Sequence, residues 1–256
     1  MKCVIVTAGA STRLRPLTDK LPKCLLTVGG KTILQRTLES ILEAKVDTTA
    51  LVVGFEAGQI RAHVRECFPG KQFPFILNPH YQSTNNAYSL LLAREFFLKT
   101  RPGVQVRDGL LVLDSDVVFN PSIIKTVIGR GDVDRIALRV SGHHDAEEIL
   151  VKTDDNGNVV KIGKGLALRD AFGESIGIEY FTHDTMRSLF DILLERVRGG
   201  KGRTEFYEAA FQELVDRGVR IKAEDIGDKM AFEIDTVADL KLARERIESF
   251  ESRSDV

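Results

Sequence analysis

The sequence lacks paired cysteines, an excess of charge of either sign, and a long apolar run. Its three cysteines, Cys3, Cys24 and Cys67, have spacings that suggest neither a disulfide framework nor a metal site. Cys3 and Cys24 stand among aliphatic residues, so we expect small buried side chains in a reduced, cytoplasmic protein. A formal net charge of −1 gives no long-range attraction to nucleic acid or to a membrane. No run of apolar residues reaches membrane-spanning length, and an apolar signal region does not follow Met1.

What the sequence does contain is typical of a globular α/β protein. Of its 256 residues, 43% are hydrophobic and 29% are charged, which is enough to bury a full core. In the first half, apolar runs alternate with segments of helical periodicity, and this order predicts a parallel sheet with helices on both faces. The predicted strands are 4–7, 49–54, 73–77 and 110–113, and the predicted helices are 32–44, 59–67 and 87–97.

The second half has short strands that indicate a small antiparallel excursion in a mixed sheet. Asn156-Gly157 is a strong hairpin signal between the predicted strands 149–153 and 159–162. Residues 1–250 are expected to form a single domain, followed by a frayed polar tail over 251–256. The remaining predicted strands are 135–140, 175–181 and 219–223, and the remaining helices are 183–198, 204–217 and 236–250.

The loop after the first strand has the chemistry of a polyphosphate site. Small residues allow a ligand to approach the backbone closely, and their successive N–H groups suit phosphate oxygens. Arg13 adds a planar, permanent charge and Lys23 a compact one. An ordinary strand-to-helix connection with solvated basic residues is the alternative. The residues expected to contact a nucleotide here are Ala8, Gly9, Ala10, Ser11, Thr12, Arg13 and Lys23.

Two other phosphate motifs are excluded. Gly30-Lys31-Thr32 looks like the end of a Walker A loop, but Leu25 stands where that motif requires glycine. We therefore expect a turn there, with Thr32 capping the next helix. The loop after the first strand also lacks the Gly-x-Gly-x-x-Gly pattern of a dinucleotide site.

The first loop resembles the signature of the nucleotidyltransferases that activate sugar phosphates and related alcohol phosphates. This resemblance implies a Rossmann-like, mixed but mostly parallel sheet flanked by helices, as in nucleotide-diphospho-sugar transferases. It also implies a catalytic role for Lys23 and Arg13, with Mg²⁺ as the cofactor. The matching residues are Gly9, Thr12, Arg13, Leu14, Pro16, Leu17, Thr18, Pro22 and Lys23.

Two acidic segments could hold the metal. Asp114-Ser115-Asp116 ends a buried strand, where open α/β sheets bind ligands, and carboxylates there suit Mg²⁺. A solvated turn is the alternative. Asp235 is a second candidate, although Asp235 or Thr236 could instead cap the last helix. The resemblance implies that Asp116 and Asp235 are the metal ligands, and we expect Ser115 to contact the nucleotide.

Asn85 and Asn86 are the residues most informative about the base. Their segment resembles the Asn-Asn-x-Tyr-Ser-Leu of the choline-phosphate cytidylyltransferase group. Side-chain amides offer both donors and acceptors, as recognition of cytosine requires. Capping of a helix by Asn85 is the alternative, and both roles can coexist.

Several residues are candidates for binding the second substrate. Lys164 matches the later lysine that binds the substrate phosphate in the family, although its usual sequence context is absent. Aromatic and acidic side chains together can hold an amine, but acids near a helix start also favour its dipole. The absence of tryptophan weakens a choline cage, so aminoethylphosphonate and an uncharged polyol phosphate stay open. The acidic and aromatic candidates are Glu179, Glu205, Tyr207 and Glu208, together with the acidic segment 145–148.

The sequence therefore predicts a Mg²⁺-dependent cytidylyltransferase that makes a CDP-alcohol from CTP and a small phosphate or phosphonate ester. The alternatives are a uridylyl- or thymidylyltransferase acting on a sugar 1-phosphate and a non-catalytic nucleotide-binding regulator. The expected partners are CTP and the phosphorylated alcohol, without nucleic acid or membrane, and a homodimer is left open. His143-His144 could suggest a transition metal, but adjacent residues on a strand point to opposite faces.

Overall fold

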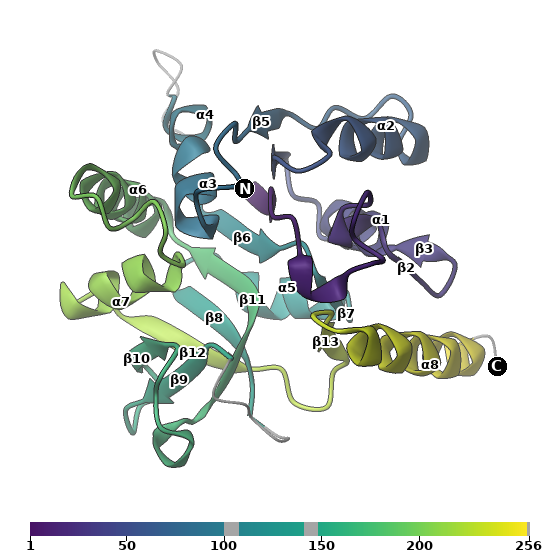
Figure 1. Ribbon diagram of the computed structural model, residues 1–256. Helices are drawn as coiled ribbons and strands as arrows, with labels where there is room; N and C mark the ends of the chain where they lie inside the picture. The colour runs from purple at the N-terminus through teal and green to yellow at the C-terminus, as the bar shows by residue number, and fades with distance from the viewer. Residues whose placement is uncertain (100–107, 141–147, 255–256) are drawn as a thin grey trace.

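A nine-stranded sheet runs through the molecule, with helices on both of its faces (Figure 1). The computed structural model describes residues 1–99, 108–140 and 148–254. The strand order is β10-β9-β11-β6-β1-β4-β5, and β8 and β12 extend from β11. The predicted histidine pair and most of the acidic segment 145–148 lie outside the described residues.

The first half forms the parallel part of the sheet, as predicted. β1 (Lys2–Thr7) lies between β4 (Thr48–Val53) and β6 (Leu110–Asp114) and is parallel to both, and β5 (Phe75–Leu77) adds an edge strand. In this register Val6 lies opposite Asp114. The loop after β1 and the acidic end of β6 are therefore neighbours at one edge of the sheet.

The second half supplies the predicted antiparallel excursion. β11 (Gly173–Phe181) is antiparallel to β6, and β9 (Leu150–Thr153) and β10 (Val159–Gly163) form the hairpin that Asn156-Gly157 indicates. Gly157 has a φ of 72°, a conformation that favours glycine. β8 (Asp134–Arg139) and β12 (Ile221–Asp225) complete the sheet.

Two apolar clusters hold the helices against the sheet. Ile5 packs into the cluster beneath α1 (Ile33–Glu43), α2 (Ala57–Cys67) and α5 (Ser122–Ile128). Val4 packs on the opposite face, beneath α3 (Asn86–Leu92), α6 (His183–Arg198) and α7 (Glu208–Asp216). Both side chains are fully buried, and each such burial stabilises the fold by about 1.5–3 kcal/mol. Cys3 and Cys24 are buried in the first cluster, as predicted.

Three predicted helices have different bounds in the structure. The helix predicted over 87–97 is divided at Ala93, whose N–H bonds to the Leu90 carbonyl in a tightened turn before α4 (Arg94–Leu98). α7 begins at Glu208 instead of residue 204. α8 (Val237–Ser254) continues past residue 250, where we expected order to end.

Two short strands that the sequence did not reveal join the metal-binding candidates. β7 (Val117–Phe119) pairs with β13 (Ala231–Glu233), and the N–H of Ile234 donates to the carbonyl of Asp116 at 2.9 Å. This pairing places Asp235 beside Asp116. The other short elements are η1 (Thr12–Leu14), η2 (Lys23–Leu25), β2 (Thr27–Val28), β3 (Lys31–Thr32) and η3 (Leu168–Asp170).

Thr32 caps α1 as predicted, because its hydroxyl accepts a hydrogen bond from the N–H of Gln35 at 3.1 Å. Within the described ranges, no helix is both long enough and apolar enough to cross a membrane.

Candidate active site

A cleft of about 490 Å³ opens at the carboxyl end of β1 and β6. Its first wall is the loop after β1, which contributes Ala8, Gly9 and Ser11. A Cβ added to Gly9 would meet nothing within 4 Å, so the cleft has room for a ligand against this backbone. Thr18 supports the loop by donating its hydroxyl hydrogen to the Ser11 carbonyl at 2.7 Å. Ala10 and Thr12, also expected to contact the nucleotide, do not line the cleft.

Lys23 lies between the two predicted metal ligands. Its Nζ is 2.7 Å from Asp116 Oδ2 and 2.6 Å from Asp235 Oδ1, and its side chain is only 9% exposed. Burial alone would lower the pKa of this amine, but the two carboxylates outweigh burial and hold the pKa above its ordinary value. Arg13 completes the group, with Nη2 at 2.6 Å from Asp235 Oδ2. The structure thus brings together the four residues to which the resemblance assigns catalysis and metal binding.

Glu233 is a third carboxylate at this place, and sequence reasoning missed it. Single oxygens of Asp116, Glu233 and Asp235 all lie within 4.8 Å of one another. The Glu233 side chain is exposed, but its partial withdrawal from water and the neighbouring charges of Asp116 and Asp235 raise its pKa above the ordinary value. Residues 233 and 235 are two apart at the end of β13, so both can face the same side. That spacing was the signal available in the sequence.

The donor set fits a hard divalent cation such as Mg²⁺. Carboxylate oxygens are its preferred protein ligands, and three of them converge here. Asp116 Oδ1 is buried and has no hydrogen-bond partner in the described part of the chain. An oxygen in that state is suited to a ligand that brings positive charge.

Asp235 does not cap the last helix. The hydroxyl of Thr236 accepts from the N–H of Asp239 at 3.2 Å, and the Asp239 carboxylate accepts from the N–H of Thr236 at 2.7 Å. This reciprocal pair is a capping box. The Asp239 carboxylate also accepts a hydrogen bond from the N–H of Asp235 at 3.0 Å. This bond fixes the backbone of Asp235, and the Asp235 side chain remains available to the active site.

Asn85 and Asn86 border the cleft and also have structural roles. Asn85 caps α3 by accepting a hydrogen bond from the N–H of Asn86 at 2.8 Å. Asn86 accepts from the N–H of Tyr207 at 2.8 Å. Within the described residues the Asn86 amide nitrogen donates to no group, so it is the part of this pair that can face a base. Ser115 also lines the cleft.

The other end of the cleft contains Lys164, Phe206 and Glu208. Lys164 follows β10, and its Nζ lies 4.9 Å from the centre of the Phe206 ring, in a cation–π contact. Tyr207 and Glu179 are fully buried and are not part of the cleft wall. Burial and the charge of Glu208 raise the pKa of Glu179 well above its ordinary value, so the two carboxyl groups interact.

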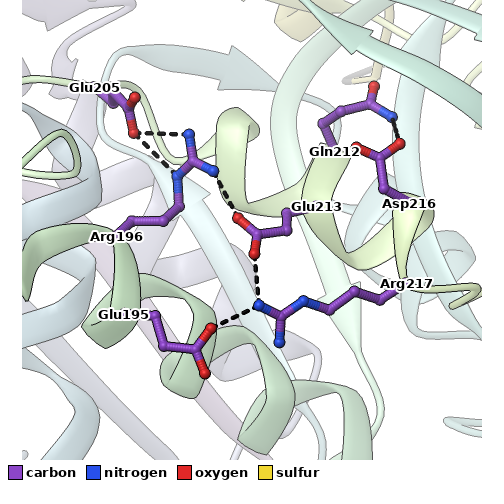
Figure 2. A network of polar contacts seen from close by, with 7 residues as sticks. All are labelled: Glu195, Arg196, Glu205, Gln212, Glu213, Asp216 and Arg217. Atoms are coloured by element: carbon purple, nitrogen blue, oxygen red, sulfur yellow. Dashed lines mark hydrogen bonds and ion pairs between the residues drawn. The ribbon is translucent and has the colours of Figure 1, made fainter. Parts of the chain in front are cut away.

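Glu205 lies outside the cleft, in a network of ion pairs between α6 and α7 (Figure 2). Its carboxylate accepts from Nε of Arg196 at 3.0 Å, and Nη1 of Arg196 also binds Glu213 at 2.6 Å. Arg217 continues the network from Glu213 to Glu195. The negative charge of Glu205 is therefore neutralised by Arg196, and this carboxylate is not available to a substrate in the cleft.

Comparisons with known proteins show which proteins this chain resembles. The chain is 29% identical over 246 residues to a bifunctional IPC transferase and DIPP synthase of Aquifex aeolicus, covering 94% of this chain and 50% of that protein. It thus spans about half the length of this curated relative. A CTP:phosphoglutamine cytidylyltransferase of Campylobacter jejuni is 24% identical, with 96% of this chain and all of that protein covered.

A solved structure supports the fold, and a family match identifies the family. The CTP:phosphocholine cytidylyltransferase of Streptococcus pneumoniae has a TM-score of 0.73 at 19% identity, over 96% of this chain and 98% of that chain, which confirms the nucleotide-diphospho-sugar transferase type of fold. Residues 3–196 match the family described as the MobA-like NTP transferase domain. These residues include Lys23, Asp116 and the loop after β1, and the chain belongs to the MobA-like NTP transferase family.

Proposed function

We propose that this protein is a Mg²⁺-dependent cytidylyltransferase that transfers CMP from CTP to a small alcohol phosphate or phosphonate and releases pyrophosphate. The observation that carries the proposal is the contact of Lys23 with both Asp116 and Asp235, with Arg13 beside them, in a cleft walled by the β1 loop. Two cations and convergent carboxylates at one point suit the charge changes of phosphoryl transfer.

The reaction needs no general base. A phosphate monoester has a second pKa near ~6, so its oxygen is already largely ionised at neutral pH. That oxygen attacks the α-phosphorus of CTP and forms the new P–O bond, while the bond from the α-phosphorus to the β-phosphate oxygen breaks. The bonding electron pair leaves on pyrophosphate. The task of the protein is to bring two anions into line and to stabilise the charge.

Each residue of the group has a role in this task. Lys23 would bind the α-phosphoryl group as it is attacked, since its two carboxylate partners hold its positive charge against the opposing effect of burial. Arg13, whose side chain is largely exposed at the cleft, would bind the departing pyrophosphate with the N–H groups of the Gly9 loop. Asp116, Asp235 and Glu233 would hold Mg²⁺, which when bound neutralises phosphate charge and orients the phosphoryl oxygens.

The preference for CTP is supported by Asn86 and by the names of the relatives. The free amide nitrogen of Asn86 can donate to a ring nitrogen or carbonyl of cytosine. The Campylobacter relative, which matches over its whole length, is named as a cytidylyltransferase that uses CTP.

The test is pyrophosphate release with Mg²⁺ and each of CTP, UTP, dTTP, ATP and GTP. The acceptors are phosphocholine, phosphoethanolamine, aminoethylphosphonate, inositol phosphate and glucose 1-phosphate. We expect turnover with CTP and an alcohol phosphate or phosphonate. Turnover confined to UTP or dTTP with the sugar phosphate would contradict the role of Asn86, and no turnover with any pair would contradict the proposed function.

A further inference from the structure

Two buried carboxyl groups at the acceptor end of the cleft each have an oxygen without a hydrogen-bond partner among the described residues. Glu208 is 5% exposed and lines the cleft, and its Oε2 has no hydrogen-bond partner in the part of the chain that the structure describes. Behind it, Glu179 is fully buried and its Oε2 is likewise unpartnered.

No arginine, lysine or histidine of the described chain forms an ion pair with Glu179 or Glu208. The one polar contact of Glu179 is the Ser175 hydroxyl, which donates to Oε1 at 3.2 Å. Uncompensated buried carboxylates destabilise a fold, because charge is removed from water without an opposite charge. Asp116, Asp235 and Glu205 each pair with a lysine or an arginine, whereas Glu179 and Glu208 do not.

Lys164 acts on Glu208 without forming an ion pair with it, because its ammonium group contacts the Phe206 ring. Lys164 lowers the pKa of Glu208 to some extent, yet burial dominates and raises that pKa to about 7. The Lys164 ammonium lies over the Phe206 ring, at the border of the cleft, where it can meet a substrate phosphate. A ligand that carries a positive charge would therefore supply the ion-pair partner that Glu208 lacks within the described residues.

We propose that Glu208, supported from behind by Glu179, binds a protonated primary amine of the acceptor, so that the acceptor is a short aminoalkyl phosphate or aminoalkyl phosphonate. This inference rests on the proposed nucleotidyl transfer and narrows its acceptor to one chemical class. Glu208 is the residue that touches the amine, and Glu179 acts through Glu208 as a positioning residue.

A primary amine fits these groups better than a quaternary one. An ammonium group carries three N–H donors, which can satisfy acceptors, whereas a quaternary ammonium has none. A quaternary cation needs open aromatic faces. At this end of the cleft the Phe206 face is taken by Lys164, and Tyr207 is fully buried.

The size of the cleft favours a short acceptor. The metal-binding candidates, Asp114 and Glu208 all line the same cleft of about 490 Å³. Gly177 leaves the space that the Asp114 side chain occupies, since a Cβ there would lie 2.7 Å from Asp114 Oδ2. An acceptor that shares this cleft with a nucleotide, and that has its phosphate near the metal-binding candidates and its amine at Glu208, is best served by a short carbon chain.

The decisive experiment compares two acceptors of nearly equal size, phosphoethanolamine and 2-hydroxyethyl phosphate. Calorimetric titration of the protein with each, in the presence of Mg²⁺, measures binding without turnover. We expect phosphoethanolamine to bind at least tenfold tighter than 2-hydroxyethyl phosphate and tighter than phosphocholine. Equal affinities, or binding of neither phosphate, would overturn the inference.

Substitutions test whether Glu208 causes the preference for phosphoethanolamine over 2-hydroxyethyl phosphate. Glu208→Gln should reduce the preference to less than threefold, and Glu179→Gln should reduce it in part. The control Asp216→Asn removes a carboxylate from the far end of α7 and should leave the preference unchanged. If Glu208→Gln does not fold, Glu179→Gln and the acceptor pair on the unaltered protein still decide the matter.

The two proposals can fail separately. Pyrophosphate release from CTP could proceed with 2-hydroxyethyl phosphate or inositol phosphate at the same rate as with phosphoethanolamine. That result would support the cytidylyltransferase activity and contradict the amine site. Selective binding of phosphoethanolamine without pyrophosphate release from any nucleotide would support the amine site and contradict the proposed reaction.

Discussion

Lys23 is the residue on which the proposed reaction depends most directly. Lys23→Met removes its charge and keeps most of its buried side chain, so we expect kcat to fall by about 10²–10³ with CTP. The fold should persist, although Asp116 and Asp235 would lose their shared partner.

Lys20→Met is the matched control for that change, because Lys20 is an exposed lysine of the same loop. It should turn over CTP at close to the rate of the unaltered protein. Lys23→Met with near-normal kcat would remove Lys23 from the proposed mechanism.

Glu208 should give the amine preference a pH dependence. Burial raises its pKa to about 7, Lys164 opposes that rise, and Glu179 and Asp114 are the other charged groups facing it. The ionised form binds an ammonium, and its fraction grows as pH rises. The ratio of kcat/KM for phosphoethanolamine to that for 2-hydroxyethyl phosphate should therefore increase about tenfold from pH 6 to pH 8. The phosphate group titrates alike in both acceptors and cancels, so a ratio flat with pH would contradict this role of Glu208.

At the scale of elements, the ion-pair network of Figure 2 holds the start of α7 against α6. Arg196 bonds both Glu205, before the helix, and Glu213, inside it. Arg196→Met should therefore raise KM for the acceptor more than KM for CTP, since Phe206 and Glu208 are carried by this segment. We expect a loss of about 1–2 kcal/mol in the free energy of unfolding.

Arg217→Met tests the same network at its exposed end. Arg217 is 48% exposed and binds Glu195 and Glu213 but not Glu205. Its change should reduce stability by less than about 1 kcal/mol, measured by urea unfolding, and leave KM for the acceptor unaltered. Equal effects of the two variants on KM would mean that the network does not position the segment.

The elements also show what the sequence could and could not predict. The long aliphatic strands and the amphipathic helix 183–198 were predictable because each has a clear period over many residues. β7 and β13 have three residues each, which is too short for a period, and their pairing joins segments over a hundred residues apart. Glu233 was missed with them. Glu205 and Glu208 could not be separated, because helical spacing does not apply to residues that precede the start of α7.

At the scale of the whole molecule, the cleft joins residues from both halves of the chain, so its ligands should stabilise the entire fold. CTP with Mg²⁺ at a hundred times its Kd should stabilise by about 2.7 kcal/mol. For a chain of this length that corresponds to a rise of about 5–10 °C in Tm. Chelation of Mg²⁺ with EDTA should remove most of the rise, measured by calorimetry. Equal protection with and without the chelator would argue against metal bound at Asp116 and Asp235.

The contact of Lys23 with Asp116 and Asp235 has a consequence for the order of binding. The lysine is a tethered counter-ion, held where a free cation would otherwise sit, and the two carboxylates are already neutralised by it and by Arg13. A metal ion from solution must compete for the two carboxylates with the ammonium group of Lys23, which is covalently part of the protein. Nucleotide phosphates can attract Lys23 and Arg13 and so vacate the carboxylates, which means that metal and triphosphate should enter together and that metal alone should bind weakly.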